Sequence, residues 1–162
     1  MNVEFINPFL QSASNILTTM ATLETQRGSA TVHCEDLPHA DITGIIEMVS
    51  DEATGVVAVS FPKPVILEIA KRMLDEEYLE IDETVSNLVG EITNMVYGGA
   101  KALLDEQGYN FDLAIPRVIQ SRDIELDFPK GCAVIQVPLS TEAGVFFVEI
   151  SFEGTEALCE IQ

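Results

Sequence analysis

The chain has 162 residues, 47% of them hydrophobic and 22% charged, which suits a single domain with a sizeable core. Its 27 Asp and Glu residues against 8 Lys and Arg give a formal net charge of −19, so nucleic acid and membrane surfaces are excluded as expected partners. The charge leaves two interpretations, simple solubility or attraction of a protein with a basic patch. Cysteines without metal-ligand spacing, no signal-peptide pattern and no apolar run of about 18 residues predict a cytoplasmic protein.

The first half of the chain is predicted to hold two helices separated by a hairpin. Apolar residues at helical spacing predict a helix over residues 6–23, with Asn7 as its N-cap and Pro8 at its first position. The other expected elements are a short strand at 29–34, hairpin strands at 42–50 and 55–61, and an amphipathic helix at 65–77.

The second half begins with the longest predicted helix, from Asp82 or Thr84 through Glu106, closed by Gly108. A strand is expected after Pro116, over residues 117–124. The chain then forms a second hairpin, with strands at 132–140 and 145–152.

The two hairpins resemble each other. Residues 44–61 and 133–152 each read as an apolar strand, an acidic turn containing Ala, a Gly, a second apolar strand and a closing Ser-Phe. Each follows a helix that carries an Asn, Asn15 or Asn94. The pattern predicts an α+β fold in one domain, residues 1–162, in which duplicated helix-plus-hairpin units form one largely antiparallel sheet with two long helices on one face. The alternative is that any two hairpins share such features.

The long helix has an apolar face and a narrow polar line opposite it. At about 100° per residue, one side collects Val85, Leu88, Val89, Ile92, Met95, Val96 and Leu103. The other side collects Asn87, Glu91, Asn94, Gly98, Lys101 and Asp105, called the polar stripe below. Glu91 and Asn94 are three residues apart, so their side chains project together. A solvated helix face is the simpler interpretation of the spacing alone.

Glycines beside the pair favour a docking surface. Gly90 and Gly98 flank Glu91 and Asn94, and each costs about 1 kcal/mol against Ala inside a helix. Small residues at these positions would let the backbone of another protein come close. Gly99 points more towards the core, where close packing of the helix on the sheet is the simpler explanation.

The chemistry open to this pair is limited. The sequence has no nucleophile elbow and no phosphate-binding Gly loop, and His33 and His39 are not at metal-ligand spacing. A carboxamide is a poor base, but it can hold a water by accepting one hydrogen bond and donating another. A carboxylate can capture a lysine. An enzyme with these groups must position water against a substrate that is already reactive.

VGEITNMVYGGAK, residues 89–101, with Pro116 following Asn94 after 21 intervening residues, resembles the signature of the CheC, CheX and FliY chemotaxis phosphatases. The opening INPFLQSASNIL is similar to the first helix of the CheX proteins in this family. The resemblance covers essentially the whole chain. It implies a phosphatase that hydrolyses the aspartyl phosphate of a CheY-like response regulator in chemotaxis or related two-component signalling.

By that resemblance, Glu91 would grip the regulator's active-site lysine, and Asn94 would align water for attack on phosphorus. Mg²⁺ would belong to the regulator, so no cofactor is expected on this chain. Asn87, Gly90, Gly98 and Lys101 would border the contact. The resemblance also implies a homodimer formed through sheet edges.

The sequence departs from the family pattern at two places. Asn87 stands where Ser or Asp is often found, and Ser86 is one residue out of step. The first helix has Ser12 and Asn15 in place of Glu and Asn, which implies one active centre per chain. Two other functions stay open: a non-catalytic docking module for a response regulator or flagellar switch component, and an acidic scaffold that oligomerises through its sheet edge.

Overall fold

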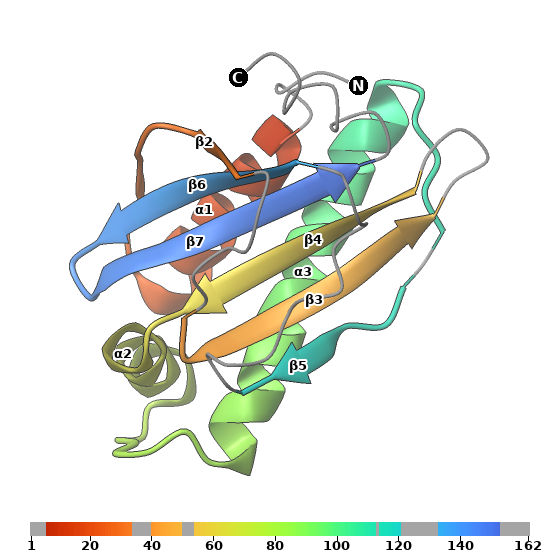
Figure 1. The fold of residues 1–162 in the computed structure, drawn as a ribbon. Coiled ribbons are helices and arrows are strands. Elements are labelled where there is room, and N and C mark those ends of the chain that lie inside the picture. The colour runs from red at the N-terminus through yellow and green to blue at the C-terminus, as the bar shows by residue number, and fades with distance from the viewer. Residues whose placement is uncertain (1–5, 34–39, 50–53, 113, 121–132, 153–162) are drawn as a thin grey trace.

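The computed structural model describes residues 6–33, 40–49, 54–112, 114–120 and 133–152. The helices are α1 (Asn7–Ala21), α2 (Lys63–Leu74) and α3 (Glu83–Glu106). The strands are β1 (Gln26–Arg27), β2 (Thr31–His33), β3 (Ile42–Val49), β4 (Thr54–Phe61), β5 (Arg117–Ile119), β6 (Val134–Thr141) and β7 (Gly144–Phe152). Figure 1 shows the α+β architecture that the sequence predicted, with α1 and α3 behind one antiparallel sheet.

The sheet joins the two predicted hairpins through their second strands. Its order is β1-β6-β7-β4-β3-β5, and β2 also pairs with β6. β4 and β7 lie antiparallel at the centre, with Val57 opposite Ile150 and Val59 opposite Val148. The short strand after each long helix pairs with the other hairpin, since β2 lies along β6 and β5 along β3. Each half of the chain therefore completes the sheet of the other half.

Alternation along the strands explains why the helices cover one face. Ile42, Ile46 and Met48 of β3 point into the main core, whereas Ile45 points to the opposite face of the sheet. Gly44 lies on the helix side, and a Cβ there would overlap the hydroxyl of Thr93 on α3. The missing side chain at Gly44 lets α3 approach the sheet closely at this point.

The helix ends agree with the sequence in part. Of the two predicted starts of α3, Asp82 is the N-cap: the backbone N–H of Val85 donates to Asp82 Oδ1 at 2.9 Å, and Gly108 follows the helix with φ 93°, as predicted. The prediction for α1 was wrong, because Ile6 is its N-cap and has no side-chain capping bond. Asn7 Oδ1 instead accepts a hydrogen bond from Arg27 Nη1 at 3.4 Å. The Asn7 side chain, which the sequence predicted to cap α1, therefore bonds to a residue of β1 instead.

Other boundaries moved by a few residues. α2 begins at Lys63 and stops at Leu74, because Asp75 adopts a left-handed conformation with φ 54°. β5 is only three residues long, and residues 121–124 of the predicted strand lie outside the described part of the chain. Residue 132, predicted to start the last hairpin, also lies outside it. β1 was not predicted, since its two residues carry no apolar pattern.

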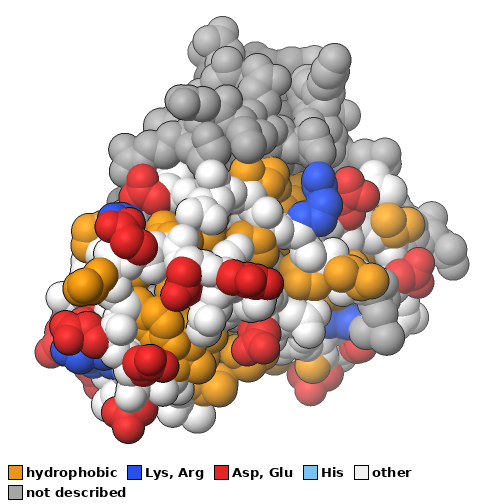
Figure 2. Space-filling model, turned by 90° about the horizontal axis from the view of Figure 1, so that it is seen from below, with side chains coloured by type: hydrophobic (Ala, Val, Ile, Leu, Met, Phe, Trp, Pro, Cys, Tyr) orange, Lys and Arg blue, Asp and Glu red, His pale blue; other side chains and the backbone are white. Residues whose placement is uncertain are grey.

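The surface keeps the acidic excess of the sequence. Figure 2 shows acidic side chains spread over the end of the molecule, with hydrophobic ones between them and few basic ones. Ion pairs among the described residues join Lys63 with Glu80, Arg72 with Glu68 and Glu142, and Lys101 with Asp105. These pairs neutralise only a small part of the charge, so a partner with basic groups would meet an attractive field.

Candidate active site

Helix α3 is held on three sides. It contacts α1 on one side, β3 beneath it and β5 on the other side. Its buried side chains are Val85, Leu88, Val89, Ile92, Thr93, Val96, Tyr97, Ala100 and Leu104. Leu103, predicted to lie on this face, is only half-buried, and Leu104 takes its place. The chain turns back against the last helical turn, where Tyr109 N–H bonds to the Leu104 carbonyl at 2.9 Å.

The polar stripe lies on the remaining, solvent-facing side of α3. Asn87, Glu91, Asn94 and Gly98 are exposed. Gly90 and Lys101 are half-buried. The structure therefore places the predicted catalytic pair side by side on an open helix face, fixed by the packing of the opposite face.

The polar atoms of Glu91 and Asn94 are not occupied by any partner in the described part of the chain. Among the described residues, neither the Glu91 carboxylate nor the Asn94 carboxamide forms a hydrogen bond or an ion pair. Lys101 differs, because its ammonium group lies 3.1 Å from Asp105 Oδ2 one turn further along the stripe. The carboxylate and carboxamide are therefore available to an incoming molecule, whereas Lys101 must first release Asp105.

The three glycines of α3 have different surroundings. A Cβ on Gly98 would meet nothing within 4 Å, so the backbone is bare to solvent there. A Cβ on Gly90 would lie 3.4 Å from Val118 of β5. The interpretation of Gly99 was wrong: a Cβ would overlap Ser12 on α1, so this glycine serves helix–helix packing and not helix–sheet packing. Only Gly98 presents an open flank to the pair.

The segment between α3 and β5 runs back along the helix. The Tyr97 hydroxyl donates to the Asp112 carbonyl at 2.5 Å, and Asp112 N–H donates to the Val49 carbonyl at 2.9 Å. Burial raises the pKa of Tyr97 to about 12, so its phenol stays protonated and acts as a donor, not as a base. Further on, Gln120 Nε2 donates to the Ile81 carbonyl at 3.2 Å. These contacts fix the border of the polar stripe.

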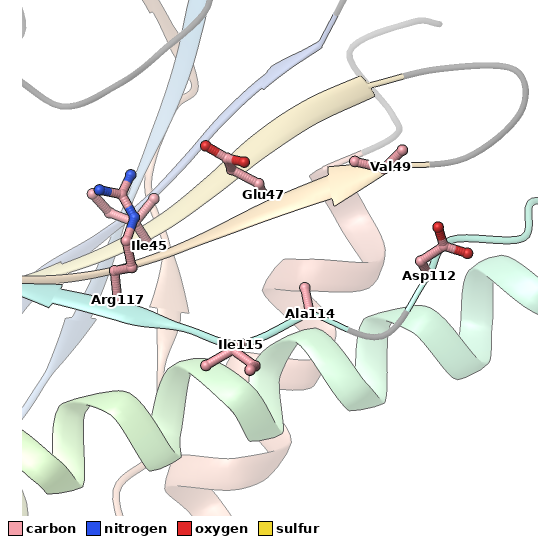
Figure 3. A pocket seen from close by; sticks show the side chains of 7 residues that line it. All are labelled: Ile45, Glu47, Val49, Asp112, Ala114, Ile115 and Arg117. Carbon is pink, nitrogen blue, oxygen red and sulfur yellow. The ribbon is translucent and has the colours of Figure 1, made fainter.

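The same segment leaves a pocket beside β3 that the sequence did not predict. Its volume is about 410 Å³, and its lining residues are Ile45, Glu47, Val49, Asp112, Ala114, Ile115 and Arg117 (Figure 3). The pocket exists because β5 pairs only with Thr43 to Ile45 of β3, after which the two chains separate. No periodicity in the sequence signals where such pairing stops.

One buried acid lies away from the stripe, on the opposite face of the sheet. Glu149 of β7 is fully buried, and Gln136 Nε2 donates to its Oε1 at 3.4 Å. Oε2 has no hydrogen-bond partner among the described residues. Burial raises the Glu149 pKa to about 7. This group is a stability determinant and not a part of the candidate site.

The described residues show neither a metal-binding cluster nor a membrane-spanning helix. No group of three or more His, Cys, Asp or Glu side chains in this part of the chain is placed to hold a metal ion. None of the described helices is long and apolar enough to cross a membrane.

Comparison with known proteins agrees with the geometry. Residues 42–140 match the family model described as chemotaxis phosphatase CheX. The chain is 26% identical to the CheY-P phosphatase CheX of Thermotoga maritima over 143 residues, which cover 86% of this chain and 89% of that protein. A CheC-like superfamily protein from Shewanella sp. PV-4 is 43% identical, with a TM-score of 0.87, and the match covers 95% of this chain and 100% of that one.

A solved complex has the same fold. It is the CheX–CheY complex with BeF₃ and Mg²⁺ from Borrelia burgdorferi, which is 22% identical, with a TM-score of 0.75, over 93% of this chain and 99% of that one. The family match spans more than half of the sequence and includes the helix that carries Glu91 and Asn94. The chain belongs to the CheX family of chemotaxis phosphatases.

Proposed function

We propose that this chain hydrolyses the aspartyl phosphate of a CheY-like response regulator, with Glu91 and Asn94 as its catalytic residues. The observation that carries the proposal is the exposed, internally unpaired Glu91–Asn94 pair on α3 of a CheX-family chain. The name of the Thermotoga relative, a CheY-P phosphatase, supports the substrate. The Borrelia complex supports a CheY-like protein as the partner.

Glu91 is the binding member of the pair. Its carboxylate projects to solvent, where an ammonium group of the regulator can reach it without displacing an internal partner. A charge-assisted hydrogen bond of this kind becomes stronger once docking excludes water. The bond holds the regulator in one orientation over α3.

Asn94 is the member that positions water. Its carboxamide accepts one water hydrogen through the oxygen and donates from nitrogen towards the phosphoryl group. The water oxygen attacks phosphorus in line with the bond to the aspartyl oxygen. The P–O bond breaks, the aspartate carboxylate leaves with the bonding electrons, and the water proton passes to phosphate or solvent. Inorganic phosphate and the free regulator are the products.

The energy required from such a site is modest. A hundredfold acceleration corresponds to about 2.7 kcal/mol of barrier. Holding one water in line and pairing one charge are sufficient for this, because an acyl phosphate is a reactive substrate. Mg²⁺ would be bound by the regulator, as the composition of the Borrelia complex suggests, and would neutralise phosphoryl charge there. This chain then supplies the carboxylate and the carboxamide only.

The residues around the pair fit a docking surface. Gly98 exposes its backbone because it has no side chain. Gly90 likewise has no side chain that would project from the helix beside β5. Asn87 is exposed one turn before Glu91 and can bond to the regulator. Lys101 can do so after exchanging Asp105 for a partner carboxylate. We assign all four residues to partner binding.

One active centre per chain is part of the proposal. Ser12, at the position in α1 that corresponds to Glu91, is buried, and its hydroxyl lies 3.5 Å from the Met95 carbonyl. A buried serine cannot capture a lysine of a docking protein. The exchange of β2 and β5 between the halves supports a duplicated origin of this single domain.

The assembly and location of the chain are also proposed. We expect a cytoplasmic homodimer that joins sheet edges, because β5 pairs only with Thr43 to Ile45 of β3 in the described part of the chain. Light scattering coupled to size exclusion tests the dimer, and a monomeric mass at micromolar concentration would contradict it.

The experiment that tests the function follows phosphate loss from purified, phosphorylated CheY-like regulators of the same organism. Acceleration of dephosphorylation by the wild-type chain but not by the Asn94→Ala variant supports the proposal. Binding of a regulator without acceleration would favour the non-catalytic docking module. The intact pair favours the enzyme, since a docking module does not need a water-positioning amide.

A further inference from the structure

Ile115 is the most exposed large hydrophobic side chain in the described part of the chain, with 89% of its surface accessible. Single exposed hydrophobic residues are common on protein surfaces and carry no meaning by themselves. The position of Ile115 and the rigidity of its segment are therefore the observations that decide its role.

Ile115 belongs to a segment that is fixed on both sides. Before it, Asp112 is bonded to Tyr97 of α3 and to Val49 of β3. After it, Arg117 and Val118 pair with β3. Ala114 packs against the core, and Pro116 restricts its own φ. A side chain presented by such a segment loses little conformational entropy when a partner covers it.

The same contacts place Ile115 beside the polar stripe. Asp112 touches α3 at Tyr97, and Val118 is next to Gly90, so the direction from Asp112 to Val118 is antiparallel to the helix. Seven helical residues span about 10 Å. Ile115 is the midpoint of the segment, so it lies at about the level of Asn94. Figure 3 shows the Ile115 side chain on the opposite side of its segment from the Arg117 guanidinium, which points towards Glu47.

We propose that Ile115 is an apolar anchor for the response regulator and a further binding residue of the docking surface. This inference rests on the proposed function, because the occupant is the same regulator that reaches Glu91 and Asn94. A protein that covers Asn94 and the bare backbone of Gly98 can also reach the adjacent segment that carries the exposed Ile115. Burying this side chain releases water from it and strengthens binding. An aliphatic side chain has no group that acts on phosphorus, so it affects binding and not the chemical step.

The test compares Ile115→Ser with Leu79→Ser, a matched control. Leu79 is also highly exposed, at 78%, but lies in the connection between α2 and α3, where neighbouring Glu80 is paired with Lys63. For Ile115→Ser we expect the KM for the phosphorylated regulator to rise about tenfold, equivalent to about 1.4 kcal/mol of binding, with kcat unchanged. Leu79→Ser should leave both constants as in the wild type, and Ile115→Leu should restore most of the binding.

An unchanged KM for Ile115→Ser, an equal rise for Leu79→Ser, or a fall in kcat at saturating regulator would overturn the inference. Direct binding of the BeF₃-activated regulator, measured by calorimetry, separates this inference from the proposed function. If the wild-type chain binds the regulator but does not hydrolyse its phosphorylated form, the proposed phosphatase function is contradicted. If the wild type and Ile115→Ser bind the regulator with equal affinity, the anchor role of Ile115 is contradicted. Unchanged circular dichroism and melting temperature of each variant confirm that the fold is intact.

Discussion

The hydroxyl of Tyr97 on α3 donates a hydrogen bond to the carbonyl of Asp112, and this bond fastens the returning segment to the helix that carries the candidate site. Tyr97 is 2% exposed, and its bond to Asp112 is partly buried. The bond therefore connects the helix that carries the polar stripe with the segment that carries Ile115.

Tyr97→Phe is expected to lower the free energy of unfolding by about 1 kcal/mol, because it leaves the Asp112 carbonyl without this donor. Urea denaturation measures the change. Tyr78→Phe is the control, since the Tyr78 hydroxyl makes only an exposed contact of 3.4 Å with Glu76. Equal losses for the two variants would show that the Tyr97 bond contributes nothing specific.

Glu91→Gln is expected to reduce kcat/KM at least tenfold, because the amide keeps the shape of the carboxylate but loses its charge. The stability of the variant should equal that of the wild type, since Glu91 is exposed and has no internal partner among the described residues. Steady-state dephosphorylation over a range of ionic strengths provides the measurement. Glu106→Gln, the same change at the exposed end of α3, is the control, and an equal loss there would indicate a general charge effect.

Two substitutions at Gly98 separate helix stability from access. Gly98→Ala should raise the free energy of unfolding by up to about 1 kcal/mol with activity retained, because a Cβ there meets no neighbour. Gly98→Leu should abolish both regulator binding and activity, since its side chain occupies the approach to Asn94. Thermal unfolding and calorimetric binding are the two measurements. Wild-type affinity in Gly98→Leu would place the regulator elsewhere.

Glu149 predicts a pH dependence of stability. Its pKa, about 7 in the folded chain because of burial, is raised above the ordinary 4.5. The folded state therefore holds its proton more tightly, and the stability from this group is complete below about pH 4.5 and lost as the pH rises through 7. Glu149→Gln should remove this slope and stabilise the chain at pH 8 by up to about 3 kcal/mol.

Urea unfolding of wild type and Glu149→Gln at pH 5 and pH 8 gives the difference directly. Comparing the two proteins at each pH cancels the contribution of the other acidic residues. A difference in stability between the variants that does not change with pH would contradict the assignment.

Local patterns predicted most of the elements and the orientation of α3, because helical periodicity and strand alternation depend on neighbouring residues. Helical periodicity also predicted that Glu91 and Asn94 are exposed, and the structure confirms this exposure. The errors have long-range causes. Asn7 bonds to Arg27 of β1, and Gly99 accommodates Ser12 of α1.

The pocket beside β3, the anchor position of Ile115 and the burial of Glu149 were not predictable in this way. Each depends on where a distant segment pairs or separates. β5 leaves β3 after Ile45, and this separation creates the pocket and presents Ile115. Side-chain alternation along β7 places Glu149 on the face of the sheet away from the helices, which normally predicts an exposed side chain. Glu149 is nevertheless fully buried.

The most direct measurement is the single-turnover rate of dephosphorylation of a phosphorylated CheY-like regulator, together with its affinity, for the wild type and Asn94→Ala. Asn15→Ala, the exposed asparagine of α1, is the matched control. We expect a loss of at least a hundredfold in rate for Asn94→Ala alone, with regulator affinity and unfolding free energy unchanged. Wild-type rates in Asn94→Ala would contradict it, because no water would then depend on that carboxamide.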